Sequence, residues 1–142
     1  MSATVDANVL LYSVNRDAEE FAVARKLLDD LGSGPDIVYL FWPTLMGFLR
    51  ISTHPGILPN PLAPSAAEDL VGRLCARAHV RTPGETTAFW DLYRATGGGP
   101  RGNDVPDAHL ATLMRAHGVS VIYSRDRDFK RYEGIEVRDP FG

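Results

Sequence analysis

The stretch T-V-D-A-N-V-L-L-Y-S-V-N, residues 4–15, decides the fold because a strand pattern changes into a helix pattern within it. Its first residues favour a short strand that ends near Asp6. The apolar run V-L-L-Y that follows, residues 9–12, favours a helical turn. The stretch therefore predicts a strand that leads directly into a helix, with an aspartate at the junction.

The same alternation of short strands and helices continues along the chain. Helices are expected from Asp17 to residue 31, from Pro43, from Ser65 (where Glu68 completes a capping-box signature), over residues 85–96 and from about residue 104 to Gly118. Further strands are expected at residues 37–41, 119–123 and 135–137. Residues 53–64 and the glycines 97–99 are expected to be loops, the second one mobile. This order predicts one three-layer α/β domain over residues 1–142, with a central, mostly parallel sheet flanked by helices.

The composition is that of an ordinary soluble protein, with 44% hydrophobic and 23% charged residues. No apolar run approaches the roughly 20 residues of a membrane span. The N-terminal residues lack the pattern of a signal peptide. The single cysteine, Cys75, excludes an internal disulfide bond. These features predict a cytoplasmic protein that does not contact a membrane.

The net charge of −3 lacks the basic excess that is usual for proteins that bind nucleic acids. The charges are unevenly distributed, however. Arginine accounts for 13 of the 15 basic residues, and four basic side chains crowd residues 125–131. An acidic cluster that holds a metal ion, surrounded by arginines, would give this net charge and still bind phosphate.

Three aspartates stand out by their position: Asp6 after the first strand, Asp107 at the start of a helix, and Asp126 after the strand at 119–123. Asp104 and Asp128 are close to them in the chain. Ligands of open parallel sheets bind outside the carboxyl ends of the strands, where Asp6 and Asp126 are expected. Hard divalent cations prefer oxygen ligands, and a cation would neutralise carboxylates that otherwise repel one another. The pattern favours a Mg²⁺ or Mn²⁺ site.

Each aspartate also has a purely structural interpretation. Asp6 suits an Asx turn at the end of a strand. Asp104 suits an N-cap, with Asp107 stabilising the dipole of the same helix. Asp126 and Asp128 suit a solvated turn. Taken singly, none of these residues decides between the two interpretations.

Three segments taken together resemble the PIN-domain family, and specifically its VapC-type ribonucleases. They are V-D-A-N-V-L-L-Y at residues 5–12, G-N-D-V-P-D-A-H-L-A at 102–111 and S-R-D-R-D-F at 124–129. Their order and spacing agree with the family over nearly the whole chain. The final G-I-E-V-R-D-P, residues 134–140, also fits.

The resemblance implies roles for particular residues. Asp6, Asp107 and Asp126 would be the catalytic, metal-binding carboxylates, and the groups supporting them would be Asp104, Asp128, Asn103 and Ser124. The implied activity is endonucleolytic cleavage of RNA with Mg²⁺ or Mn²⁺. The implied partners are a small VapB-like antitoxin, which blocks the site, and a second copy of the chain in a homodimer.

The sequence departs from the family pattern at Gly47, where a glutamate is usual. Asp104 is a candidate to compensate for that carboxylate. The departure also motivates an alternative, a PIN-like RNA- or protein-binding domain whose catalytic site has decayed. A phosphate-hydrolysing enzyme for small molecules is a weaker alternative, because Asn8 stands where its second aspartate would be.

Three arginines are candidates for contact with the substrate phosphates: Arg50, Arg125 and Arg127. A guanidinium group pairs bidentately with phosphate oxygens. The alternative for each is a solvated side chain. The four histidines do not form a pair at the spacing of zinc ligands, so the sequence gives no support for a zinc site.

Overall fold

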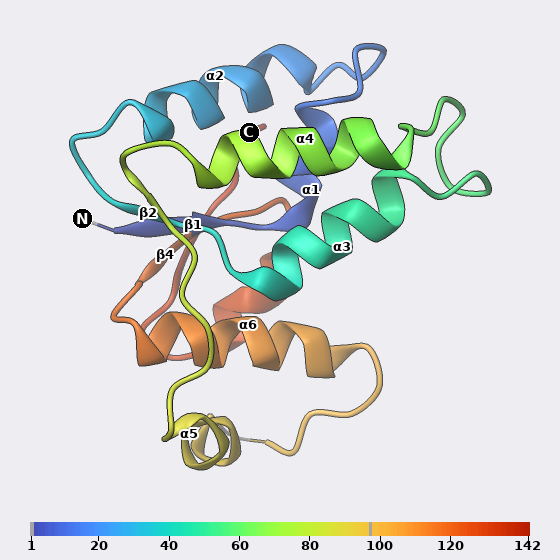
Figure 1. The fold of residues 1–142 in the computed structure, drawn as a ribbon. Helices are drawn as coiled ribbons and strands as arrows, with labels where there is room; N and C mark the ends of the chain where they lie inside the picture. The colour runs from blue at the N-terminus through green and yellow to red at the C-terminus, as the bar shows by residue number, and fades with distance from the viewer. Residues whose placement is uncertain (1, 97) are drawn as a thin grey trace.

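The computed structural model describes residues 2–96 and 98–142, and this part of the chain forms a sheet between two layers of helices (Figure 1). The sheet has five strands, β1 (Ala3–Val5), β2 (Val38–Tyr39), β3 (Val80–Arg81), β4 (Val121–Tyr123) and β5 (Glu136–Arg138). Their order across the sheet is β3-β2-β1-β4-β5, and every pairing is parallel. The predicted three-layer α/β architecture is therefore confirmed.

Helices cover both faces of this sheet. They are α1 (Ala7–Tyr12), α2 (Phe21–Gly32), α3 (Trp42–Ser52), α4 (Pro64–Cys75), α5 (Phe89–Ala95) and α6 (Asp104–Ala116), with a short 3₁₀ helix, η1 (Arg127–Arg131). In Figure 1, α2 and α4 lie on one side of the sheet, and α5 and α6 lie on the other. None of the helices in the described residues is both long and apolar enough to cross a membrane.

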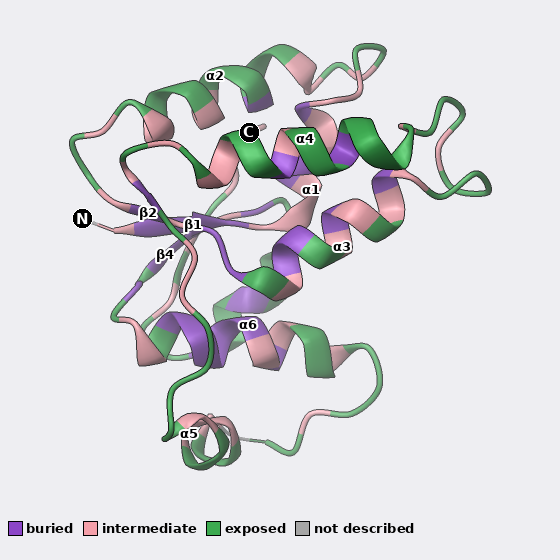
Figure 2. Cartoon of the chain, viewed as in Figure 1, coloured by how far each residue is buried: buried purple, intermediate pink, exposed green. Residues whose placement is uncertain are grey.

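Two apolar clusters hold the layers together, one on each face of the sheet. On the first face, Val5 of β1 packs with Leu10 of α1 and Phe48 of α3. On the second, Ile122 of β4 packs with the buried side of α6 and with Phe129 of η1. Figure 2 shows the buried middle of α6, where Ala108 and residues 110–114 are buried between more exposed ends of the helix. Burial of Phe129 matters for the site because it fixes the segment that follows β4.

The strand order creates a topological switch point between β1 and β4. From β1 the chain builds outward through β2 and β3, and then returns to place β4 and β5 on the other side of β1. Val5 pairs with Tyr123, and the Asp6 N–H donates to the Tyr123 carbonyl at 2.9 Å. Asp6 and Ser124 therefore emerge side by side at the carboxyl ends of the two strands, where α/β sheets bind ligands.

Some predicted helix boundaries were wrong. Helix α2 begins at Phe21 rather than Asp17, because the Asn15 side chain accepts the Asp17 N–H at 3.3 Å and holds a turn there. Helix α5 begins at Phe89 rather than residue 85. Glu85 instead bonds His109 at 2.8 Å, outside the helix.

Two predicted helix caps were also wrong. Helix α4 begins at Pro64, so Ala63 is the N-cap and Ser65 lies inside the first turn, where it forms no capping box. Asn103 occupies the N-cap position of α6, which makes Asp104 the first helical residue. The Asp104 side chain instead pairs with a residue of η1.

The strand predictions were correct in place but not in length. Of residues 37–41 only Val38–Tyr39 form β2, and the last strand is Glu136–Arg138, one residue later than expected. Strand β3 was not predicted, because two residues are too few to show an alternating pattern. In the predicted mobile glycine loop, Gly97 lies outside the described residues.

The end of α6 depends on the backbone of Gly118. The Val119 N–H donates to the Met114 carbonyl at 2.8 Å and the Gly118 N–H donates to the Arg115 carbonyl at 3.3 Å, which is a Schellman motif. Gly118 has a φ of +68°, which a residue with a Cβ adopts at a cost. This turn directs the chain from α6 into β4 and thereby sets the position of the segment that carries Asp126.

We expect Gly118→Ala to lower the free energy of unfolding by about 1 kcal/mol, because alanine is strained at positive φ. The matched control is Gly72→Ala in α4, at an exposed helical position with no heavy atom of the described residues within 4 Å of the added Cβ. That control should raise the stability by about 0.5–1 kcal/mol. Urea unfolding measures both. Equal stability of the Gly118→Ala protein and the parent would contradict the role given to this turn.

Candidate active site

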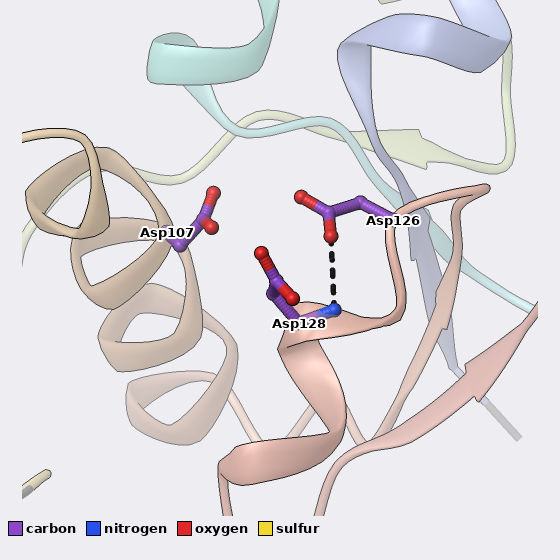
Figure 3. A group of neighbouring side chains, drawn as sticks. All are labelled: Asp107, Asp126 and Asp128. Atoms are coloured by element: carbon purple, nitrogen blue, oxygen red, sulfur yellow. Dashed lines mark hydrogen bonds between the residues drawn. The ribbon is translucent and has the colours of Figure 1, made fainter.

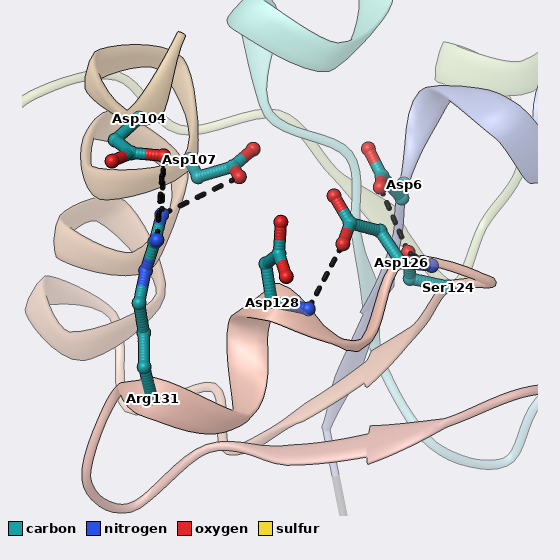
Figure 4. A network of polar contacts seen from close by, with 7 residues as sticks. All are labelled: Asp6, Asp104, Asp107, Ser124, Asp126, Asp128 and Arg131. Atoms are coloured by element: carbon teal, nitrogen blue, oxygen red, sulfur yellow. Dashed lines mark hydrogen bonds and ion pairs between the residues drawn. The ribbon is translucent and has the colours of Figure 1, made fainter. Parts of the chain in front are cut away.

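Asp6 joins the two central strands at their carboxyl ends. Its Oδ1 accepts the Ala7 N–H at 2.7 Å, so Asp6 is the N-cap of α1. Its Oδ2 accepts the Ser124 hydroxyl at 2.8 Å (Figure 4). The Asn8 amide donates to the same carboxylate oxygen and to the Ser124 hydroxyl, at 3.4 Å each. Asp6 therefore caps α1 and also bonds Ser124 at the end of the neighbouring strand.

Ser124 also shapes the segment that carries the next two carboxylates. Its hydroxyl oxygen accepts the Asp126 N–H at 2.9 Å. The Asp126 Oδ1 then accepts the Asp128 N–H at 2.9 Å and caps η1. These turns, with Phe129 buried beneath them, bring the Asp126 and Asp128 side chains toward α6 (Figure 3).

Asp107 meets them from the first turn of α6. Acidic residues are favoured there because the N-terminus of a helix carries partial positive charge. Carboxylate oxygens of Asp107, Asp126 and Asp128 lie within 4.8 Å of one another, and these three residues could hold a metal ion. We call them the carboxylate triad.

The structure thus brings all the predicted carboxylates to one place but groups them differently from the prediction. The predicted metal-binding set was Asp6, Asp107 and Asp126. The most compact set in the described residues contains Asp128, predicted only as a supporting residue, in place of Asp6. In Figure 4, Asp126 lies between Asp6 and Asp107. Asp6 is near enough to raise the pKa of Asp107 by its negative charge.

Burial and mutual repulsion weaken the acidity of this site. The pKa of Asp107 is raised to about 6, first by burial and then by the charges of Asp126 and Asp6, while Arg131 opposes the rise. The pKa of Asp6 is raised by burial, against the hydrogen bonds from Ser124 and Ala7. Ionised carboxylates held this close favour binding of a cation, which would offset their repulsion.

Arg131 is a further residue of this site, and the sequence pattern alone did not single it out. Its Nη1 and Nη2 both donate to the Asp104 Oδ1 at 3.3 Å, and its Nη2 lies 3.6 Å from the Asp107 Oδ2. The crowding of basic residues at 125–131 was a signal for it. Which of those residues faces the carboxylates depends on how η1 packs, and the sequence pattern does not reveal that.

The other predicted residues lie around this centre in different settings. Arg125 forms an ion pair with Glu20, donates to the Tyr12 hydroxyl at 3.2 Å and lies over the Phe141 ring at 5.2 Å. Its contacts therefore tie the segment after β4 to the N-terminal part of the chain and to Phe141 near the C-terminus. Arg50 in α3, Arg127 in η1 and Asn103 before α6 are exposed.

Gly47, the position of the missing family glutamate, lies in α3. A Cβ built there meets no heavy atom within 4 Å among the described residues. Packing of the described residues therefore does not require a glycine at this position. Asp128 of η1 is the third carboxylate of the triad.

Comparisons with known proteins agree with this geometry. The PIN-domain family model matches residues 3–135. The chain is 46% identical to Ribonuclease VapC48 of Mycobacterium tuberculosis over 99% of both chains, and 38% identical to Ribonuclease VapC37 of the same species over 96% of this chain and 95% of that one.

Solved structures show the same fold. The crystal structure of Mycobacterium tuberculosis VapC20, titled a Sarcin-Ricin loop cleaving toxin, aligns with a TM-score of 0.67 at 22% identity and covers 96% of this chain and 99% of that one. VapBC2 from Rickettsia felis, solved bound to a promoter DNA fragment, aligns with the same TM-score at 13% identity and covers 97% and 98%. From the family match and the full-length relatives, this chain belongs to the PIN-domain family and, within it, to the VapC ribonucleases.

Proposed function

We propose that this chain is the toxin of a type II toxin–antitoxin pair and cleaves RNA endonucleolytically with Mg²⁺ or Mn²⁺. The observation that carries the metal dependence is the carboxylate triad, whose oxygens lie within 4.8 Å of one another at the switch point of the sheet. The full-length relatives named as ribonucleases support the reaction.

The donor set fits a hard divalent cation, because it consists of carboxylate oxygens only. Asp107, Asp126 and Asp128 would hold the ion, and Asp6 would complete the set from the other side of Asp126. When bound, the ion would lower the pKa of a coordinated water and stabilise negative charge on the phosphodiester. Ser124 and Asn8 position Asp6 through the hydrogen bonds described above.

The phosphates of RNA also need compensating charge from the protein. Arg50 and Arg127 are exposed, and we propose them as phosphate contacts. We assign Arg125 a different role, because its contacts with Glu20, Tyr12 and Phe141 tie the segment after β4 to other parts of the chain. Substitution of these arginines should weaken RNA binding and its salt dependence rather than metal binding.

The partners are proposed from likeness to known structures. VapBC from Salmonella typhimurium and FitAB were both solved bound to DNA, and both share this fold, with TM-scores of 0.62 and 0.69. We propose that this chain acts in the cytoplasm, forms a homodimer, and is inhibited by a small VapB-like antitoxin that covers the carboxylate triad.

A second candidate is an RNA- or protein-binding domain with a decayed catalytic site, and Gly47 is the observation that favours it. Such a protein would fold and bind its partner without binding a divalent ion. Calorimetric titration with Mn²⁺ distinguishes the two functions, because only the nuclease needs an intact metal site.

Asp126→Asn and Asp107→Asn should each reduce RNA cleavage by at least about 100-fold and weaken Mn²⁺ binding. Loss of a direct ligand should exceed the roughly 10–100-fold effect of losing a group that only supports one. The matched control is Asp69→Asn, an exposed aspartate on α4. Cleavage of end-labelled RNA with Mn²⁺, with a chelator control, measures activity, and calorimetry measures binding.

Asp6→Asn is tested alongside these variants, because the sequence predicted Asp6 as a metal ligand and the carboxylate triad does not include it. It should also abolish most cleavage, since its charge and its bond to Ser124 organise the site. Persistent cleavage by either the Asp6→Asn or the Asp126→Asn protein would refute the corresponding assignment. Full activity in excess chelator would refute metal dependence.

Without metal, Asp107 should make stability depend on pH. Its pKa of about 6 in the folded protein is above the ordinary value of 3.8, so folding favours its protonated form. This stabilisation is complete below pH 4 and is lost as the pH rises through 6. At pH 7 in chelator, Asp107→Asn should therefore be more stable than the parent, by on the order of 1 kcal/mol.

Thermal unfolding at pH 4, 5, 6 and 7 tests this prediction. The gain from Asp107→Asn should shrink toward zero at pH 4, and saturating Mn²⁺ at pH 7 should reverse the order of the two proteins, since only the parent binds the ion tightly. A pH-independent gain would show that the charge of Asp107 is not its source.

A further inference from the structure

Arg131 connects the carboxylates to a neighbouring hollow of the surface. On one side its guanidinium group contacts Asp104 and Asp107. On the other it lines a cavity of about 570 Å³ between the end of α5, the start of α6 and the end of η1. Arg101 and Tyr132 line the same cavity. Arg131 and Asp104 both line the cavity, and Arg131 also lies beside Asp107 of the carboxylate triad (Figure 4).

The cavity has the chemistry of a site for an anionic group. Two guanidinium groups, those of Arg101 and Arg131, are among its lining residues, with Asp104 as the acidic one. A guanidinium group has five N–H donors, and the contacts of Arg131 with Asp104, Asp107 and the Tyr132 side chain still leave donor capacity for a further acceptor. The Arg131 side chain is 40% exposed, so an acceptor that enters the cavity can reach it. The volume is also in the range of small-ligand sites.

The position of Arg131 is not explained by stability. Ion pairs at exposed positions contribute little, with a median of about 0–1 kcal/mol. A cationic group 3.6 Å from the Asp107 carboxylate also competes with a metal ion for the same negative charge. An arginine that opposes metal binding is useful if its charge acts on another anion beside the metal site.

We propose that this cavity is the subsite for a nucleotide next to the scissile phosphodiester, and that Arg131 binds the phosphate of that nucleotide. The proposal rests on the ribonuclease function proposed above. RNA whose scissile phosphate is at the carboxylate triad must continue to either side of it, and the cavity adjoins the triad through Arg131. Arg101 supplies a second cationic contact, and Asp104 holds the Arg131 side chain at the boundary between the two.

A purely structural role for Arg131 and a role in phosphate binding predict different changes in Mn²⁺ affinity when Arg131 is removed. If Arg131 served only to orient Asp107 as a ligand, its removal would weaken Mn²⁺ binding. If it binds phosphate, its removal takes a positive charge away from the triad, and Mn²⁺ should bind equally or more tightly while RNA binds more weakly. The two roles are therefore separated by the sign of one measurement.

The experiment compares Arg131→Gln with Arg73→Gln, a matched control that removes an exposed arginine from α4 on the other side of the sheet (Figure 1). For Arg131→Gln we expect KM for single-stranded RNA in saturating Mn²⁺ to rise by about 10-fold or more, as for loss of a charge-assisted hydrogen bond. The slope of log kcat/KM against log salt should fall in magnitude by about 0.7. Mn²⁺ affinity without RNA, measured by calorimetry, should be unchanged or higher.

Arg101→Gln provides a second test, because Arg101 lines the cavity and is not part of the carboxylate triad. Its KM should also rise, and its Mn²⁺ affinity should stay the same. Weaker Mn²⁺ binding by Arg131→Gln, or a KM equal to that of the Arg73→Gln control, would overturn the subsite while the parent still cleaves RNA. If the parent itself neither binds nor cleaves RNA, the proposed function fails and the subsite fails with it.

Discussion

Repulsion between aspartate carboxylates at the carboxyl ends of β1 and β4 is the constraint on which the rest of this structure depends. Burial and neighbouring negative charge raise the pKa values of both Asp6 and Asp107, so in the absence of a cation the fold holds these groups together at a cost. A protein selected for stability alone would separate or neutralise them. Their closeness at the switch point of a parallel sheet is the observation that supports the proposed metal-dependent reaction.

Each element around the carboxylates limits that cost by a different physical means. The start of α1 gives Asp6 a backbone donor, and Ser124 gives it a hydroxyl donor. The first turn of α6 places Asp107 at the positive end of a helix dipole. Burial of Phe129 holds η1, and with it Asp128, against the repulsion of its neighbours. These contacts hold the carboxylates near one another, and a fixed arrangement of this kind reduces the reorganisation that a reaction needs.

The arrangement of the carboxylates bears on Gly47, which stands where the family usually has a glutamate. Loss of the family glutamate removes one carboxylate, but three aspartates still converge because η1 carries Asp128 as well as the turn from Asp126. The three carboxylates of the triad therefore converge without a residue from α3. Arg131, from the same short helix, brings positive charge to this acidic centre. One segment of eight residues, 124–131, thus supplies hydrogen-bond donors, two carboxylates of the triad and a positive charge.

The sequence by itself determined the layered parallel fold and the identity of the acidic residues, because both depend on local patterns. Strand ends and helix starts can be read from neighbouring residues, so Asp6 and Asp126 were expected at one edge of the sheet, and the family resemblance added Asp107 to them. Only the tertiary structure decided that Asp128 joins the compact group, that Asp6 lies beside it, and that Arg131 rather than Arg125 faces the carboxylates. The directions of those side chains follow from how η1 packs through Phe129 and how α6 docks on the sheet. Both depend on contacts between residues far apart in the chain, which no local pattern encodes.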